Sequence, residues 1–279
     1  MSQMRIGEHT IMFSTRVNAG LIHDKGYAIV VDTLLGPAEA QQIKEAVEAE
    51  GVSVDYVFNT HYHSDHTFGN CVFDAPVVTS DADGDIMRRN LDGAWSAEAL
   101  KNWAKANPGT PEDFRVVVPS LTFSDAMTVY AGDLACRLQA YAGHTPGSAI
   151  AAVEADGIIF AGDLLFIGRY PYIGDGNISR WCGALRRLLR LAECAKAVVP
   201  GHGPLLFGPT IRIEITKLLT FFEDNLAVAS ALVAKGVSRE EAVRRPEFPR
   251  LVTDVPTPQE REIAGIQKFY DEAMSWGKR

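Results

Sequence analysis

Histidine and aspartate side chains follow several apolar, strand-like segments of this chain, and their placement constrains the fold more than any other feature. The densest group comes directly after the segment at 54–60 and consists of His61, His63, Asp65 and His66. On a regular strand alternate side chains share one face, and a loop at its end lets the later two turn elsewhere. Imidazole and carboxylate without thiolate form the donor set of zinc, iron or manganese, and argue against a structural cysteine-type zinc site.

Three further donors stand in glycine-flanked segments. His144 lies in Gly-His-Thr-Pro-Gly-Ser at 143–148, Asp163 closes Ala-Gly-Asp at 161–163, and His202 lies in Gly-His-Gly at 201–203. Each follows an apolar, strand-like segment, and the glycines allow the backbone to turn sharply and approach the site closely. Functional groups commonly sit at such exits, because strands are rigid and loops are free to vary.

Seven donors are too many for one metal ion and enough for two. Paired ions in hydrolases lie roughly 3.5–4 Å apart and hold a shared water or hydroxide. Two divalent ions against two carboxylates and a hydroxide leave a net positive site, which lowers the pKa of bound water and attracts an anionic or carbonyl substrate. We expect Asp163 to bridge two ions, the first held by His61, His63 and His144 and the second by Asp65, His66 and His202.

The order of expected elements indicates an α/β fold. Strands are expected at 10–13, 17–23 and 27–32, a helix from 37 to about 50, and a strand at 54–60. A mixed, partly helical excursion at 80–119 precedes strands at 121–130, 134–141, 150–153 and 157–161, a helix at 177–191 and a strand at 195–199. A helix at 210–235 and two capping-box sequences then follow. We therefore divide the chain into a catalytic domain at 1–208 and a helical extension at 209–279.

Composition limits the partners. The chain has 279 residues, 47% of them hydrophobic, so it can bury a full core, and its net charge of -8 disfavours broad binding to nucleic acid or anionic membranes. No apolar run is long enough to span a membrane, and the N-terminus lacks the apolar core of a signal peptide. The four cysteines have no paired spacing. The expected compartment is the cytoplasm, or the periplasm if a signal segment has been removed.

Together these motifs resemble the metallo-β-lactamase superfamily. The H-x-H-x-D-H run, Gly-His-Thr-Pro-Gly-Ser, Ala-Gly-Asp and Pro-Gly-His-Gly-Pro match it in order and spacing over residues 6 to 207. The resemblance implies an αββα sandwich with the metals at one edge of the two sheets. It also implies that Asp163 is the bridging carboxylate of glyoxalase II-like members, and that Asp32 holds the loop at 61–66 by hydrogen bonds.

The resemblance also ranks the activities. Most true β-lactamases of the superfamily lack the bridging aspartate, so β-lactam hydrolysis, weak if present, is an alternative. The C-terminal stretch lacks the glutathione-binding signature of a glyoxalase II, and the segment at 168–177 resembles general and quinoprotein-associated zinc hydrolases. A second alternative is an iron-dependent oxidoreductase of the same superfamily, of the persulfide dioxygenase type.

The expected enzyme is a binuclear metallohydrolase with two divalent ions, zinc foremost and manganese or iron as alternatives. A hydroxide bridging the ions would attack an ester, lactone, amide, thioester or phosphoester of a small-molecule substrate. Asp65 is the candidate for proton transfer. The Leu-rich helix after Thr210 is expected to pack on the body or on a second copy in a homodimer. The candidate substrate contacts, which equally suit loop packing, are Tyr62, Phe68, Arg169, Tyr170 and Tyr172.

Overall fold

Two β-sheets packed face to face form the centre of the molecule. The computed structural model describes residues 1–276, and within them the first sheet has the strand order β1-β2-β3-β4-β5-β6-β7 and the second β13-β12-β11-β10-β9-β8. The strands of the first sheet are β1 (Ser2–Arg5), β2 (Thr10–Ser14), β3 (Asn18–Asp24), β4 (Tyr27–Val31), β5 (Ser53–Phe58), β6 (Val77–Ser80) and β7 (Leu121–Phe123). Those of the second sheet are β8 (Ala126–Ala131), β9 (Leu134–Ala140), β10 (Ala149–Val153), β11 (Ile158–Phe166), β12 (Ala197–His202) and β13 (Leu206–Phe207).

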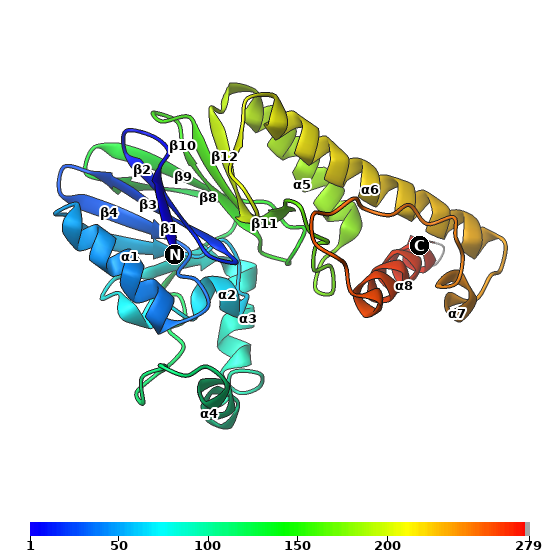
Figure 1. Cartoon of the computed structure of the whole chain (residues 1–279), viewed down its shortest axis with the longest axis horizontal. Helices are drawn as coiled ribbons and strands as arrows, with labels where there is room; N and C mark the ends of the chain where they lie inside the picture. Colours follow the sequence, from blue (N-terminus) through cyan, green and yellow to red (C-terminus); the bar gives the residue numbers. More distant parts are fainter. Residues whose placement is uncertain (277–279) are drawn as a thin grey trace.

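Helices cover the outer faces of both sheets, which gives the expected αββα layering (Figure 1). The helices are α1 (Pro37–Ala49), α2 (Ser64–Thr67), α3 (Asp81–Asn90), α4 (Ala97–Ala106), α5 (Ile178–Leu191), α6 (Pro209–Ala234), α7 (Arg239–Ala242) and α8 (Gln259–Trp276). Two single 3₁₀ turns, Asn70–Val72 and Ala192–Cys194, complete the regular structure of the described residues.

The continuous apolar runs of the inner strands explain why the first sheet is buried on both faces. On β4, Ile29 points into the core between the two sheets, where it joins Phe58 of β5 and Phe160 of β11. Its neighbour Val30 points the other way and packs with Ile43 of α1. Successive side chains of a strand alternate between faces, so strands that are apolar throughout must be covered on both sides.

The second sheet packs its outer face against the long helices of the C-terminal half. Leu164 of β11 shares one buried apolar cluster with Leu185 of α5, Phe222 of α6 and Phe269 of α8. The helix α6 therefore packs on the body of the same chain, as expected of its Leu-rich face. A domain boundary at 208/209 stays a prediction, because this cluster continues across it. Within residues 1–276, no helix is long and apolar enough to cross a bilayer.

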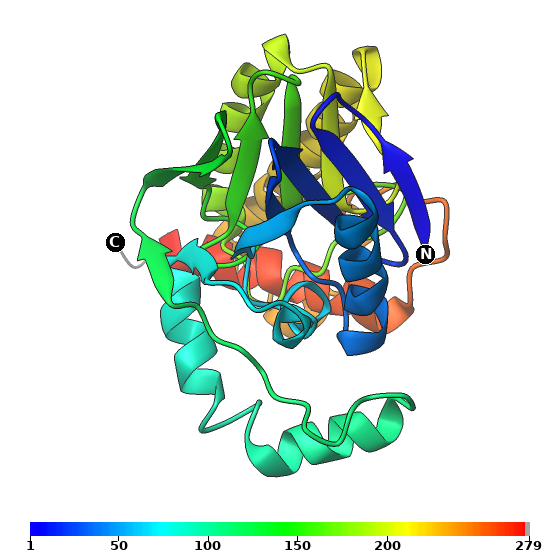
Figure 2. The ribbon, with the colours of Figure 1, turned by 90° about the vertical axis from the view of Figure 1, so that its left-hand side faces the viewer.

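The excursion at 81–119 projects from the sandwich as an arm that carries α3 and α4 (Figure 2). Its aromatic side chains gather around Phe68. The Phe68 ring lies 5.5 Å from that of Trp95, 5.1 Å from that of Trp103 and 5.6 Å from that of Phe114, centroid to centroid. This cluster anchors the arm to the loop that follows α2.

Several expected elements differ in detail. The single strand expected at 121–130 is two strands, because β7 ends the first sheet and β8 begins the second after a turn at 124–125. The strand expected at 157–161 continues to Phe166, so Asp163 lies within β11, and His202 lies at the end of β12. The strands β1, β6 and β13 were not expected. They are short, and β1 is exposed along its whole length, so it lacks the apolar alternation that predicts a strand.

Candidate metal centre

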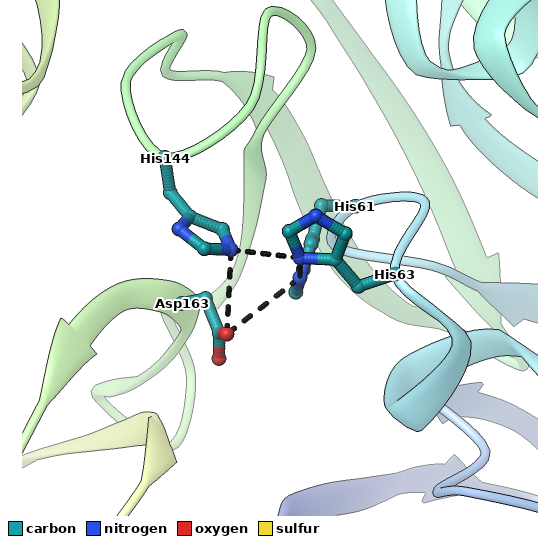
Figure 3. A group of neighbouring side chains, drawn as sticks. All are labelled: His61, His63, His144 and Asp163. Atoms are coloured by element: carbon teal, nitrogen blue, oxygen red, sulfur yellow. Dashed lines mark hydrogen bonds and ion pairs between the residues drawn. The ribbon is translucent and has the colours of Figure 1, made fainter. Parts of the chain in front are cut away.

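Seven histidine and aspartate side chains from five segments meet at one edge of the sandwich. They fall into two groups whose potential ligand atoms lie within 4.8 Å of one another inside each group. The first group draws its members from the β5–α2 loop, the β9–β10 loop and β11 (Figure 3), and the second from α2 and the end of β12. The first contains His61, His63, His144 and Asp163, and the second contains Asp65, His66 and His202.

Asp163 lies between the two groups. Its Oδ2 atom is 3.4 Å from Nε2 of His144 and 3.7 Å from Nε2 of His61, both in the first group. The same oxygen is 3.3 Å from Nε2 of His202, and Oδ1 is 3.2 Å from Nε2 of His66, both in the second group. A single carboxylate therefore faces both groups, which is the position a bridging ligand needs.

The backbone beside Asp163 is shaped for this close approach. A Cβ atom at Gly201 would lie 1.9 Å from Oδ1 of Asp163 and 2.7 Å from the carbonyl carbon of Gly162. Any side chain at position 201 would push Asp163 out of its place. The glycine before His202 is thus a steric requirement of the centre.

The outer nitrogen of each imidazole is held by an acceptor, which fixes the ring. Nδ1 of His144 donates to the carbonyl of Tyr172 at 3.0 Å, and Nδ1 of His202 donates to the carbonyl of Arg16 at 2.7 Å. Nε2 of His63 donates to the Asp175 carboxylate at 2.9 Å. In each neutral ring the inner nitrogen is then left with a lone pair directed at the centre.

Asp32 holds the remaining rings by hydrogen bonds. Its Oδ2 accepts from Nδ1 of His66 at 2.8 Å and from the Thr60 hydroxyl at 2.7 Å, and its Oδ1 accepts from the Thr60 amide at 2.8 Å. The Thr60 oxygen in turn lies 3.1 Å from Nδ1 of His61, which donates to it. Asp32 has φ 56°, a left-handed conformation that aspartate tolerates better than most residues.

The inner atoms of the centre fit a cation and little else. Nδ1 of His63 lies 3.1 Å from Nε2 of His61 and 2.9 Å from Nε2 of His144. Because the proton of each neutral ring is on its outer nitrogen, these three inner nitrogens face one another with lone pairs only. Nε2 of His66 and Oδ1 of Asp163 are both sealed from solvent; they lie 3.2 Å apart, but neither makes a well-aligned hydrogen bond among the described residues. Buried polar atoms without partners are costly, and a divalent ion would satisfy them.

The charges of the two groups differ. Burial lowers the pKa of His144 to about 3 and lowers that of His61 well below its usual value, so both rings are neutral at pH 7. Burial also acts on His202, but Asp163 and Asp65 outweigh it and raise the pKa of that ring to about 9. Burial opposes ionisation of Asp163, yet the surrounding histidines hold its pKa well below the usual range. The first group is therefore ready for an ion, and the second carries protons that an ion must displace.

Three carboxylates that the sequence analysis missed support the centre. Asp83 is fully buried in the first turn of α3, and it accepts from the Tyr62 amide at 3.1 Å, the Gly147 amide at 2.8 Å and the Thr145 hydroxyl at 2.7 Å. It thus ties the loop of His61 and His63 to the loop of His144. The other two are Asp175, which holds His63, and Glu272 of α8, which holds the start of α5. A capping signal at Ser80 marks the helix of Asp83, but no sequence pattern marks these long-range contacts.

The five candidate substrate contacts take different places. Tyr172 is 44% exposed and its ring centroid lies 5.6 Å from that of His63, and the Tyr62 hydroxyl donates to Asp175 at 2.7 Å beside the same ring. Phe68 is 3% exposed inside the aromatic cluster of the arm, which suits packing. Tyr170 faces a cavity between the C-terminal helices, and Arg169 lies beside α6 with Lys217. The structure therefore brings Tyr62 and Tyr172 to the centre and leaves the other three away from it.

A two-sheet sandwich with paired imidazole and carboxylate groups at one edge defines a class of metal-binding α/β proteins. The family model of the metallo-beta-lactamase superfamily matches residues 14–203, and the chain belongs to this superfamily. The family expected from the motifs, and the sandwich fold it implied, are thereby confirmed.

Relatives and solved structures resemble the chain over most of its length. It is 27% identical over 225 residues to a hydroxyacylglutathione hydrolase of Methylococcus capsulatus, covering 81% of this chain and 73% of that protein. It is 26% identical over 207 residues to an acyl-coenzyme A thioesterase of Bos taurus, covering 67% of this chain and 73% of that one. A metallo-beta-lactamase family protein of Thermus thermophilus superposes with a TM-score of 0.65 at 22% identity, over 94% of this chain and 89% of its own.

Proposed function

We propose that the protein is a metal-dependent hydrolase that uses two divalent ions, zinc foremost, to cleave an ester, lactone, amide, thioester or phosphoester of a small molecule. The observation that carries this proposal is the position of the Asp163 carboxylate between two groups of inward-facing imidazole nitrogens. When bound, two ions of this kind lower the pKa of water and polarise the substrate oxygen. The first group would hold one ion and Asp65, His66 and His202 the other.

The residues of the chain divide the remaining work. Asp32, Asp175 and the carbonyls of Tyr172 and Arg16 accept from the outer nitrogens of the rings and so keep the inner nitrogens aimed inward. Tyr172 and Tyr62, whose rings both lie beside that of His63, are placed to contact a substrate that reaches the first group. These groups orient and bind, and the rigidity of their hydrogen bonds reduces the reorganisation that the reaction requires.

Asp65 is assigned first to holding an ion. Its side chain is 32% exposed against 4% for Asp163, so a substrate could reach it. Although burial opposes ionisation, the hydrogen bond with His202 and the charge of His66 lower the pKa of Asp65 to about 2. A carboxyl group with that pKa is a weak base, so proton transfer through Asp65 is a secondary role.

Thioesters are the first substrates to test. Two relatives are named hydroxyacylglutathione hydrolase and acyl-coenzyme A thioesterase, and the bond that each name implies is a thioester. β-Lactams are less favoured substrates, because most true β-lactamases of the superfamily lack the bridging aspartate that Asp163 resembles. We expect turnover of acyl thioesters to exceed turnover of β-lactams.

The test joins metal analysis to a hydrolysis panel. Elemental analysis of protein purified without added metal should give about two zinc or manganese ions per chain. The panel should contain acyl-coenzyme A and acylglutathione thioesters, esters, lactones, phosphodiesters and a β-lactam. A single iron per chain with oxygen uptake and no hydrolysis would move the protein to the oxidoreductase alternative.

A variant pair sharpens the test. Asp163→Asn keeps the shape of the side chain but removes the charge between the two groups, and it should lose at least one ion per chain together with the hydrolysis. Asp133→Asn, at an exposed carboxylate on the turn before β9, changes the same net charge far from the centre and should alter neither.

A further inference from the structure

A cavity of about 550 Å³ lies among the C-terminal helices, apart from the metal centre. It is lined by α6, the segment that follows α7, and the first half of α8, which Figure 1 shows grouped on one side of the molecule, and Tyr170 of the β11–α5 loop forms part of its floor. None of the seven candidate metal ligands lines it. Its volume falls within the range of sites that bind small organic molecules, roughly 300–1,000 Å³.

The floor of the cavity carries two polar groups that the protein leaves unsatisfied. Tyr170 is 7% exposed and Asn225 is 1% exposed. The Asn225 amide donates to the carbonyls of Phe221 at 2.7 Å and Pro249 at 3.2 Å, which fixes its orientation. Among residues 1–276, neither the Asn225 side-chain oxygen nor the Tyr170 hydroxyl has a hydrogen-bond partner, and neither atom is sealed from the cavity.

The position of the Tyr170 hydroxyl is held by packing alone. A Cβ atom at Gly265 of α8 would lie 2.0 Å from that oxygen, so the glycine leaves room for it. The ring packs edge-on against Phe221, with centroids 5.6 Å apart. A buried tyrosine hydroxyl normally has a partner, so one held here without any is available to a ligand.

The rim of the cavity is cationic in a chain whose net charge is -8. Three arginines line it, Arg244, Arg245 and Arg250, against one acidic side chain, Glu262. Arg245 pairs with Glu241 outside the cavity, and Arg250 approaches Glu262 at 3.9 Å. A positive excess remains after both pairs are counted, and no ion pair or side-chain hydrogen bond engages Arg244 within the described part of the chain.

The wall between floor and rim is apolar. Phe248 is 7% exposed, and Ile263 and Ile266 line the same side from α8. Guanidinium groups recognise carboxylates and phosphates, apolar walls take hydrocarbon, and an unpartnered tyrosine hydroxyl beside an amide oxygen takes a polar substituent.

We propose that this cavity binds an amphiphilic organic anion. Its carboxylate or phosphate would lie at the arginine rim, its hydrocarbon against Phe248, Ile263 and Ile266, and a hydroxyl or amide of the ligand at Tyr170 and Asn225. Binding here requires no hydrolysis at the metal centre. The site nevertheless adjoins it along the chain, because Tyr170 is two residues from Tyr172, whose carbonyl orients His144.

Calorimetric titration of the metal-loaded protein with octyl phosphate tests the proposal, with octanol and inorganic phosphate as partial probes. Octyl phosphate should bind at least tenfold more tightly than either, because each partial probe lacks one of the two recognition elements. Equal affinity for octanol or for inorganic phosphate would overturn the proposal, as would the absence of binding.

Variants separate this cavity from the metal centre, which also attracts phosphate. Arg244→Gln with Arg250→Gln, both at exposed positions, should weaken octyl phosphate binding about 10- to 100-fold, and Arg137→Gln on β9, equally exposed, should not. Tyr170→Phe keeps the ring packing and should weaken a ligand with a hydroxyl substituent, 8-hydroxyoctyl phosphate, about 3- to 10-fold more than octyl phosphate. If the double arginine variant leaves the binding of octyl phosphate unchanged, and Tyr170→Phe leaves the binding of 8-hydroxyoctyl phosphate unchanged, the probes bind at another site and the proposal is refuted.

Discussion

At the scale of single residues, each ring of the centre depends on the group behind it. Nε2 of His63, for example, donates to Asp175, and this sends its Nδ1 inward, whereas the rings of His144 and His202 present Nε2. The choice of nitrogen follows from the partner and not from the histidine itself. Residues that never touch a metal therefore decide which atoms can bind one.

Asp83 is the first of these supporting residues to test. Asp83→Asn removes the charge that holds the amides of Tyr62 and Gly147, so His63 and His144 should lose their mutual position. We expect the affinity of the first group for zinc to fall about 10- to 100-fold, with the second group less affected. Competition with a chromophoric chelator measures both steps.

The matched control is Asp81→Asn, in the same turn of α3. Asp81 is only partly buried and accepts from Ser124 at 2.6 Å, outside the centre. If both variants weaken zinc binding equally, the effect comes from the stability of α3 and not from the contact of Asp83 with the loops of His63 and His144.

Protonation separates the two groups. His202, with a pKa raised to about 9, and His66, raised well above its usual value by Asp163 and Asp32 against the effect of burial, carry protons in the metal-free protein at pH 7. His61 and His144 do not. A metal ion and a proton compete for the same ring nitrogen. The affinity of the second group for a metal ion should therefore fall as the pH falls below about 9, by about tenfold per pH unit for each displaced proton.

Zinc titration by calorimetry in buffers of different ionisation enthalpy counts the released protons directly. At pH 7, protons should be released when zinc binds to the second group and not when it binds to the first. Equal release at both steps would contradict this division of charge.

At the scale of elements, α8 holds the β11–α5 loop in place, and this loop carries the Tyr172 carbonyl and the Asp175 carboxylate that orient His144 and His63. Glu272 accepts from the amides of Ile178 and Ser179, each at 2.7 Å, at the N-terminus of α5. Lys268 donates to the carbonyl of Gly174 at 3.0 Å. The segment between these contacts includes Asp175, so the C-terminal helix and the metal centre are linked by a few bonds.

Replacing Glu272 tests this link. Glu272→Gln removes a buried charge from a helix N-terminus and should lower the free energy of unfolding by about 1–2 kcal/mol. Asp271→Asn, beside it but exposed in an ion pair with Arg239, should cost less than about 1 kcal/mol. Urea denaturation measures both, and similar losses in the two variants would show that the cap contributes nothing of its own.

Much of this arrangement follows from the sequence. Apolar alternation predicts the inner strands, and the glycine-flanked donors predict the two groups and their division. The turn that separates β7 from β8 could not be predicted, because residues 121–130 form one strand-like run and the change of sheet is a tertiary event. The roles of Asp83 and Glu272 could not be predicted for the same reason, because each side chain binds a partner more than 20 residues away.

At the scale of the whole molecule, the centre joins the two sheets. Four of its donors follow β5 of the first sheet, and the other three come from the β9–β10 loop, β11 and β12 of the second. Ions bound there would cross-link the sheets at one edge and favour the folded state by mass action.

Metal removal should therefore lower the melting temperature. An ion present at about 1,000 times its dissociation constant stabilises the folded state by about 4 kcal/mol, which corresponds to several degrees. Differential scanning calorimetry before and after chelation measures this shift, and added zinc should reverse it. Chelation should have a smaller effect on Asp163→Asn, and an equal effect would argue against the bridging position.

The separation of the sheets along the chain also has a consequence for biosynthesis. Strands β1 to β7 end at Phe123 and β8 to β13 begin at Ala126, so neither sheet borrows a strand from the other half. A nascent chain can assemble the first sheet and present its four donors well before the others leave the ribosome. His202 emerges last, and until then any captured ion is held by an open, incomplete set. Two ions bound as proposed would therefore meet their complete set of ligands only late in translation.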